Sequence, residues 1–312
     1  MSAFQAPGND VIEADVSKSL QEDIGTGDVS AGLIEDGIES GYVIAKQAAV
    51  ICGRPWFDAC FRRLDPNVTL QWLVSEGDEV ADGTVLVRFS GRTRALLGAE
   101  RSALNFLQTL SATATRTAAF AKALRGTNTR VLDTRKTLPG LRQAQKYAVR
   151  VGGGVNHRMG LYDAVMLKEN HIIAEGSIAG AVAKARARHP ALPIIVEVET
   201  LDELRQALDT DCTRILIDDF PEADMRDAVR IADGRKALEV SGSVNLDRLP
   251  AIAACGVGFV SVGAITKHIH KLVDSLTSGA ELSADDAALV AGVDAKNLDK
   301  ARETGNGLLA DV

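Results

Sequence analysis

Polar and ionisable residues end a series of short apolar runs in the second half of this chain. The runs lie near residues 129–133, 163–167, 194–198, 214–218, 237–241 and 259–262. The residues that end them are Asp133, Lys168, Glu197, Asp218, Ser241 and Ser261. Carboxylates, an amine and hydroxyls that meet in one place could bind phosphates, hold a metal ion or stabilise a developing charge. Each carboxylate taken singly could instead cap the following helix.

The segments between the apolar runs predict how these ends meet. Residues 178–188, 201–208 and 223–232 carry apolar residues at helical spacing, so strands and helices alternate. This alternation predicts a parallel sheet, and in a β/α barrel the carboxyl ends of the strands form one rim where chemistry takes place. Six or seven strands are expected, which is short of the eight of a standard barrel.

Cationic charge is concentrated between Arg130 and His171, where eight lysines and arginines stand against three carboxylates in a chain of net charge −7. Arg142, Lys146 and Arg150 recur at helical spacing and predict a solvated helix face. The candidates for anion binding stand at strand ends and in glycine-rich turns; they are Arg135, Lys136, Arg158 and Lys168. A Schiff-base role for Lys168 is the less favoured alternative, because no single amine stands apart from this cluster.

Two turns of small residues follow late strands, at Ser241–Ser243 and Val262–Ala264. Backbone N–H groups in such turns, ahead of a helix, commonly hold phosphate in the last strands of a barrel. The triple glycine Gly152–Gly154 lacks the lysine of a nucleotide P-loop, so we expect a flexible loop near the ligand.

Composition argues against several classes of protein. The net charge disfavours nucleic acid and anionic lipid as partners. The longest apolar stretch, Ala251–Ile265, is interrupted by glycines and is too short to span a membrane. Four cysteines without a CxxC pair indicate a reducing compartment, and the first residues show no secretory signal. We therefore expect a cytoplasmic protein with no membrane segment.

The first ~110 residues follow another pattern and predict a separate α/β domain. A helix is expected near Val11–Glu22, followed by several strands with glycine and aspartate turns. A long helix should then run from about Thr93 to Leu124. Arg101 lies on this helix among apolar residues, where an arginine is ordinarily a surface residue whose stem covers apolar neighbours.

A set of motifs in order resembles the quinolinate phosphoribosyltransferase family, up to about Thr277. Together these motifs are highly specific, although no one of them would suffice. The first four are QEDIGTGDVS at 21–30, ERSALNFLQTLSATAT at 100–115, LDTRKTLPGLR at 132–142 and GGGVNHRMGLYDAVMLKENHI at 152–172. The later four are IIVEVET at 194–200, ILIDDF at 215–220, EVSGSVNLD at 239–247 and FVSVGAIT at 259–266.

The resemblance implies an N-terminal α/β sandwich domain over residues 1–112 and an open β/α barrel of six or seven strands over residues 113–271. Residues 272–312 would return to the N-terminal domain, with an extra tail from about residue 278. Family members form homodimers in which the partner's N-terminal domain completes each barrel site. Assembly into a higher oligomer is left as an alternative. Arg101 would then serve the neighbouring subunit's site.

The resemblance also implies a site for quinolinate and phosphoribosyl pyrophosphate. The residues expected around the carboxylates and phosphoryl groups are Arg135, Lys136, His157, Arg158 and Lys168, with Arg101 from the neighbouring subunit. Glu197 and Asp218 would hold Mg²⁺, directly or indirectly, and the ribose hydroxyls. The cradle of the 5-phosphate would be Ser241, Gly242, Ser243, Gly263 and Ala264. The residues expected to act in catalysis are Lys136, Lys168, Glu197 and Asp218.

The implied reaction yields nicotinate mononucleotide, pyrophosphate and carbon dioxide in de novo NAD biosynthesis. Both substrates are polyanions, so clustered cations are needed to bring them together. Two positions depart from the usual family pattern: Asp219, where asparagine is common, and Ser243, where glycine or asparagine is common. A related enzyme that uses nicotinate stays open as an alternative. A polyanion-binding protein without catalysis also stays open, although Glu197 and Asp218 argue against it.

Overall fold

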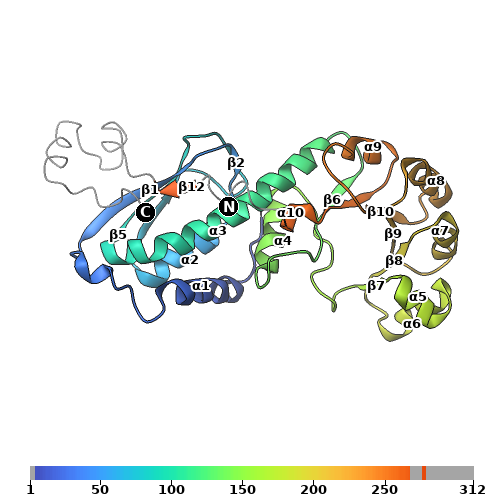
Figure 1. The fold of residues 1–312 in the computed structure, drawn as a ribbon, viewed down its shortest axis with the longest axis horizontal. Coiled ribbons are helices and arrows are strands. Elements are labelled where there is room, and N and C mark those ends of the chain that lie inside the picture. The colour runs from blue at the N-terminus through green and yellow to red at the C-terminus, as the bar shows by residue number, and fades with distance from the viewer. Residues whose placement is uncertain (1–3, 268–275, 279–312) are drawn as a thin grey trace. The chain divides into compact units, whose positions relative to one another are not determined.

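The computed structural model describes residues 4–267 and 276–278 (Figure 1). These residues divide into two compact units. The first unit holds the chain up to Ala112 together with the strand Leu276–Ser278, and the second begins at Thr113. The tail predicted from about residue 278 lies almost wholly outside the described residues.

The first unit packs helices against an antiparallel sheet of strand order β12-β1-β5-β3. The strands of the unit are β1 (Ile38–Ala45), β2 (Ala49–Val50), β3 (Thr69–Trp72), β4 (Glu79–Val80), β5 (Val85–Arg92) and β12 (Leu276–Ser278). The helices are α1 (Asn9–Ile24), the 3-10 turn η1 (Ala31–Leu33), α2 (Arg54–Leu64) and the first part of α3 (Thr93–Ala123). Rings of Phe57 and Phe61 on α2 lie 4.9 Å apart in its core. Pairing of β12 with β1 returns the late chain to this sheet.

The second unit is built on a six-stranded parallel sheet of order β6-β11-β10-β9-β8-β7. Its strands are β6 (Arg130–Leu132), β7 (Val165–Leu167), β8 (Ile194–Val198), β9 (Arg214–Asp218), β10 (Ala237–Ser241) and β11 (Phe259–Ser261). Its helices, after the second part of α3, are α4 (Arg142–Val151), α5 (Glu169–Glu175), α6 (Ile178–Arg188), α7 (Leu201–Leu208), α8 (Glu222–Ala232), α9 (Leu249–Ala254) and α10 (Ala264–Lys267). The sheet is open between β6 and β7, although one parallel bridge joins Leu132 to Val155. The predicted fold class is therefore confirmed.

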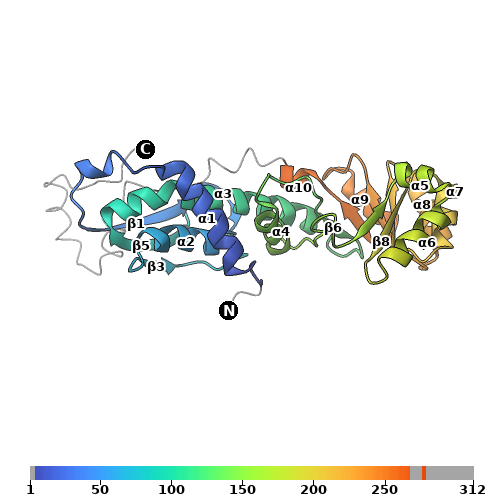
Figure 2. The same cartoon turned by 90° about the horizontal axis from the view of Figure 1, so that it is seen from below.

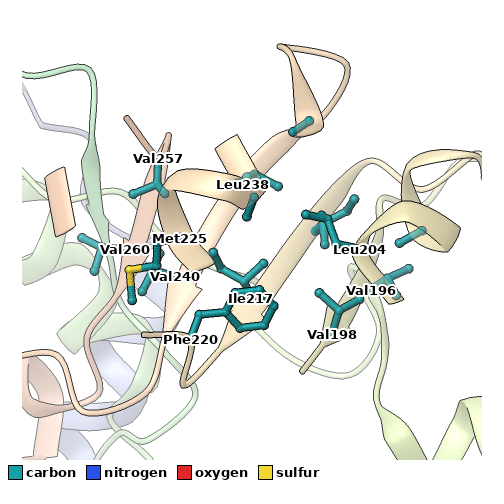
Figure 3. Packing of buried hydrophobic residues seen from close by; sticks show 14 of the residues in the cluster. Val196, Val198, Leu204, Ile217, Phe220, Met225, Leu238, Val240, Val257 and Val260 are labelled. Atoms are coloured by element: carbon teal, nitrogen blue, oxygen red, sulfur yellow. The ribbon is translucent and has the colours of Figure 1, made fainter. Parts of the chain in front are cut away.

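The hydrophobic core of this unit lies between the strands and the outer helices, which Figures 1 and 2 show grouped on one side of the sheet. Alternate strand residues such as Val196, Val198 and Ile217 pack there against Leu204 of α7 and Met225 of α8 (Figure 3). Because side chains alternate along a strand, the intervening residues face the interior of the barrel. Among the described residues, no helix is long and apolar enough to cross a bilayer.

Candidate active site

Strand register brings the predicted strand-end residues to one rim. Leu167 of β7 lies opposite Val196 of β8, so Lys168 follows beside Glu197. Ser241 of β10 lies directly opposite Asp218 of β9. The amine, the two carboxylates and the hydroxyl therefore stand on adjacent strands at the same edge of the sheet.

Lys168 and Glu197 form the central ion pair of this rim. The Lys168 Nζ donates to both oxygens of Glu197, at 2.8 and 2.6 Å. The lysine side chain is 45% exposed and the glutamate only 10%, so solvent can reach the amine while the carboxylate is enclosed. The amine is thus paired with a carboxylate and still accessible, which suits contact with an anionic ligand better than a role as a lone nucleophile.

Arg158 and Arg135 line a cavity of about 570 Å³ that also reaches Lys168. The Arg158 guanidinium donates to the carbonyl of Ala164 at 3.1 Å. Burial and then the charge of Arg135 lower the pKa of Arg158 from its usual value. Among the described residues no carboxylate pairs with either arginine. The charge of Asp163 offsets part of this pKa shift, but two guanidinium groups that form no ion pair with a carboxylate are well placed to bind an anion.

The loop after β6 places Lys136 beside the turn that follows β11. A Cβ added at Gly263 would lie 2.9 Å from Lys136 Cδ, so only glycine allows the lysine stem to pass this closely. Thr266 fixes the loop by donating its hydroxyl to the Lys136 carbonyl at 2.6 Å. The cation and the Gly263–Ala264 turn, predicted separately from the sequence, are therefore neighbours.

The two positions that depart from the family pattern lie in neighbouring turns: Asp219 directly follows β9, and Ser243 lies in the turn after β10. Asp219 and Ser243 have φ values of 50° and 45°, in the left-handed region that asparagine and glycine favour. Gly242 has a φ of 91°, and a Cβ there would collide with the Asp219 carboxylate. The common family residues at the two positions are thus those that the backbone conformation favours.

Lys146 does not lie on a solvated helix face, and that prediction is wrong for this residue. Lys146 and Asp133 both have fully buried side chains and form an ion pair beneath the rim. Burial lowers the pKa of Lys146 and raises that of Asp133, although each charge partly offsets the effect on the other. Asp133 also accepts from the His157 amide at 2.8 Å and from Asn156 Nδ2 at 2.6 Å. The pair thereby fixes the segment that leads to Arg158.

The other two cations of α4 differ from each other. Arg142 donates to the carbonyls of Met159 and Arg135, at 3.2 and 3.4 Å, so it joins the two loops that carry the cavity arginines. Arg150 is exposed, with its guanidinium 5.7 Å from the ring centre of Tyr147. Of the three residues, only Arg150 fits the predicted solvated face.

The triple glycine is a packing site and not the flexible ligand loop that we expected. Cβ atoms at Gly152 or Gly154 would lie 2.7 and 2.8 Å from Thr117 side-chain atoms on α3. Gly153 has a φ of 86°, which glycine tolerates best. These glycines let the end of α4 approach α3 closely, and the chain then turns towards Asn156.

His157 and Glu239 lie buried below the rim. The sequence analysis did not identify Glu239 as a candidate site residue. His157 is 9% exposed and Glu239 fully buried. Nε2 of the histidine lies 3.5 Å from Glu239 Oε1, and Arg214 Nε lies 2.9 Å from Oε2. The alternation Arg214, Leu216, Asp218 on β9 and Ala237, Glu239, Ser241 on β10 could have indicated that Glu239 faces the interior.

Asp218 and Arg101 are the remaining predicted site residues. No side chain in the described part of the chain pairs with the Asp218 carboxylate, which is half-buried at the end of β9. The described residues contain no group of three or more metal-binding side chains. Arg101 is exposed on α3 in the first unit.

Comparisons with known proteins place this geometry in a family. A model of the quinolinate phosphoribosyl transferase C-terminal domain matches residues 113–276, and that of the N-terminal domain matches residues 28–111. The chain belongs to the quinolinate phosphoribosyltransferase family. Within this family, the chain is similar to the probable carboxylating nicotinate-nucleotide pyrophosphorylases of Bacillus subtilis and Synechocystis. The identities are 39% and 42%, over 80% and 81% of this chain and 88% of each relative.

A solved member of the quinolinate phosphoribosyltransferase family supports the fold. The nicotinate-nucleotide pyrophosphorylase structure from Francisella tularensis is 44% identical, with a TM-score of 0.85. The match covers 89% of this chain and 98% of that one. The family predicted from the motifs is therefore confirmed.

Proposed function

We propose that this chain joins quinolinate to phosphoribosyl pyrophosphate, forming nicotinate mononucleotide, pyrophosphate and carbon dioxide. The observation that carries the proposal is the cavity beside Arg135, Arg158 and Lys168, because no carboxylate among the described residues forms an ion pair with either arginine. A planar dicarboxylate supplies the missing negative charges, and each arginine can bind two oxygens of one carboxylate. Family membership supports the same reaction.

The first chemical step exchanges the pyrophosphate on C1 of the ribose for the pyridine nitrogen. Glu197 and Asp218 stabilise the ribose as its C1 becomes oxocarbenium-like, and the bonding electrons leave with pyrophosphate. The lone pair of the pyridine nitrogen then forms the new bond to C1. The N–H groups of the turns at Gly242 and Gly263 hold the 5-phosphate, together with the side chains of Ser241 and Ser243.

Decarboxylation follows because the ring nitrogen is now cationic. The bond from the ring to the adjacent carboxylate breaks, carbon dioxide leaves, and its electron pair stays on the ring carbon next to the positive nitrogen. That carbon then takes up a proton. Lys136 and Arg158 orient the departing carboxylate, while Arg135 and Lys168 complete the quinolinate site and His157 lies next to Arg158.

The residues present fit a magnesium ion that arrives with the sugar donor. The described residues offer no all-protein cage, and Glu197 is already paired with Lys168, which leaves the unpaired Asp218 as the more available ligand. Mg²⁺ commonly binds through one or two carboxylates and substrate phosphates. When bound, the ion would neutralise charge on the departing pyrophosphate.

For assembly, we propose a homodimer in which Arg101 acts in the neighbouring subunit's site. The support is that Arg135, Arg158 and Lys168 of the second unit line one cavity, whereas Arg101 is exposed on the other unit. An isologous dimer repeats any such contribution in both sites.

A location in the cytoplasm is proposed as well, supported by four buried thiols without a disulfide, and cell fractionation tests it.

Complementation between inactive variants tests the shared site. Arg101→Ala and Lys168→Ala should each be nearly inactive, yet after co-refolding roughly a quarter of wild-type activity should return, because half of the dimers are mixed and have one native site. The control pairs Arg158→Ala with Lys168→Ala, which damage the same unit and should restore nothing. If verified Arg101/Lys168 heterodimers stay inactive, the proposal of a shared site is wrong.

A substrate comparison tests the function itself. Purified protein with Mg²⁺ and phosphoribosyl pyrophosphate is offered quinolinate, nicotinate or neither, and the mononucleotide is quantified. Quinolinate should be strongly preferred, since the cation cluster is large enough to need two carboxylates. Equal turnover of both acids would favour the nicotinate alternative, and binding of polyanions without turnover would favour the non-catalytic one.

A further inference from the structure

The imidazole of His157 uses its ring nitrogens within the protein. Nδ1 accepts a hydrogen bond from the Arg158 amide at 2.6 Å. A nitrogen that accepts a hydrogen bond carries no proton, so the ring proton of the neutral imidazole lies on Nε2. Nε2 is buried, makes no hydrogen bond in this structure and lies 3.5 Å from Glu239 Oε1.

Glu239 is held in a position where its carboxylate can accept a hydrogen bond from the Nε2–H of His157. Ser261 on the next strand donates its hydroxyl to Oε1, and the Arg214 guanidinium lies against Oε2 without aiming Nε–H at it. Burial alone would raise the pKa of the Glu239 carboxyl. The contacts with His157, Arg214 and Ser261 nevertheless hold this pKa below its usual range.

The backbone of His157 is fixed from the opposite side. Its amide donates to Asp133 at 2.8 Å, and its carbonyl accepts from Lys146 Nζ at 3.0 Å. Ring and backbone are therefore both held, and the next residue in the chain is Arg158. Of the polar groups of His157, only Nε2 is not held by a short contact. The distance between Nε2 and Glu239 Oε1 is therefore the one that can change.

We propose that Glu239 is a positioning residue that fixes the His157 ring with its proton on Nε2, so that Nδ1 holds the Arg158 amide and the Arg158 guanidinium stays aimed at the substrate carboxylate. The inference rests on the proposed function, because it takes the carboxylate of quinolinate as the ligand of Arg158. The contact between Nε2 and Oε1 shortens when the carboxylate binds, as catalytic hydrogen bonds commonly do. His157 acts here through Arg158 and not as a further cation.

A variant of nearly the same shape tests the role. Glu239→Gln keeps the volume but can donate an amide proton to Nε2, which favours the tautomer with a proton on Nδ1 and opposes the Arg158 amide. Quinolinate KM should rise about tenfold, the cost of one hydrogen bond to a charged group, while the KM for phosphoribosyl pyrophosphate stays close to wild type. Arg214→Met is the matched control: it removes the other charged neighbour of Glu239 and should lower Tm without raising quinolinate KM.

A double-mutant cycle separates action through His157 from a general loss of structure. In His157→Asn the side-chain oxygen can still accept the Arg158 amide without Glu239, so adding Glu239→Gln to it should cost little more. Independent, multiplying losses would overturn the proposal. Nitrogen NMR of the wild-type imidazole shows which ring nitrogen carries the proton and does not depend on turnover. A proton on Nδ1 would also overturn the proposal. Failure of wild type to turn over quinolinate would instead refute the proposed function.

Discussion

The buried pair of Lys146 and Asp133 makes Lys146→Met the most informative test of how the site is supported. The substitution keeps much of the side-chain length and removes a charge whose partner is fully buried. Asp133 would keep two hydrogen bonds, from the His157 amide and Asn156, whereas the His157 carbonyl would lose its donor. Because breaking a buried pair from one side typically costs 3–5 kcal/mol, we expect a loss of about 3 kcal/mol in the free energy of unfolding.

Thermal unfolding provides the assay, and the same helix supplies the control. For a unit of this size the loss corresponds to a fall in Tm of about 10 °C. Arg150→Met removes an exposed cation from α4 that lies over the Tyr147 ring, and it should change the free energy of unfolding by less than about 1 kcal/mol. Adding Asp133→Asn to Lys146→Met should recover part of the loss, since no charge is then left buried. Equal Tm values for the Lys146 and Arg150 variants would refute this reasoning.

The pH dependence of that variant follows from the same pair. Burial raises the pKa of Asp133, and removing Lys146 removes the largest influence that lowers it. A carboxyl whose folded pKa lies above its unfolded value stabilises the protein below the unfolded pKa, and that stability is lost as pH rises through the folded pKa. The Tm deficit of Lys146→Met should therefore shrink as pH is lowered from 7.

Three further outcomes are expected. Arg158→Ala should lose far more activity with quinolinate than Arg150→Ala in parallel steady-state assays, and equal losses would contradict the assignment. Ser243→Gly should raise the unfolding free energy by about 0.5 kcal/mol in urea titrations, because it relieves a left-handed serine. Burial raises the pKa of Asp163, but the hydrogen bonds that its carboxylate accepts from the Gly160 and Met159 amides outweigh this effect, so the pKa is lowered. The stability it contributes is present above its unfolded pKa and lost as pH falls, so Asp163→Asn should flatten the acid limb of a Tm profile.

Much of the second unit could be predicted from periodicity. Helices expected at 178–188 and 201–208 are observed as α6 (Ile178–Arg188) and α7 (Leu201–Leu208), because their apolar faces pack on one sheet. In the first unit, α2 went unpredicted. Its N-cap glycine offers no side-chain capping signal, and its aromatic residues are equally typical of strands.

The sequence predicted the position of a polar residue where the end of a strand fixes that position, and it did not where burial decides. Strand-end position was enough to gather Lys168, Glu197 and Asp218 at one rim. Spacing could not distinguish Lys146 from Arg150, because only the tertiary partner Asp133 makes a buried lysine tolerable. The glycines at 152–154 were misassigned for a similar reason, since the approach of α3 is not visible in local sequence.

The measurement that tests the central claim most directly follows isotopic carbon from the carboxylate at the 2-position of quinolinate. With phosphoribosyl pyrophosphate and Mg²⁺, one labelled carbon dioxide should be released for each nicotinate mononucleotide formed, and none without the sugar donor. Arg158→Ala should reduce both products in parallel. Mononucleotide formed without labelled carbon dioxide, or carbon dioxide released in the absence of phosphoribosyl pyrophosphate, would contradict the account.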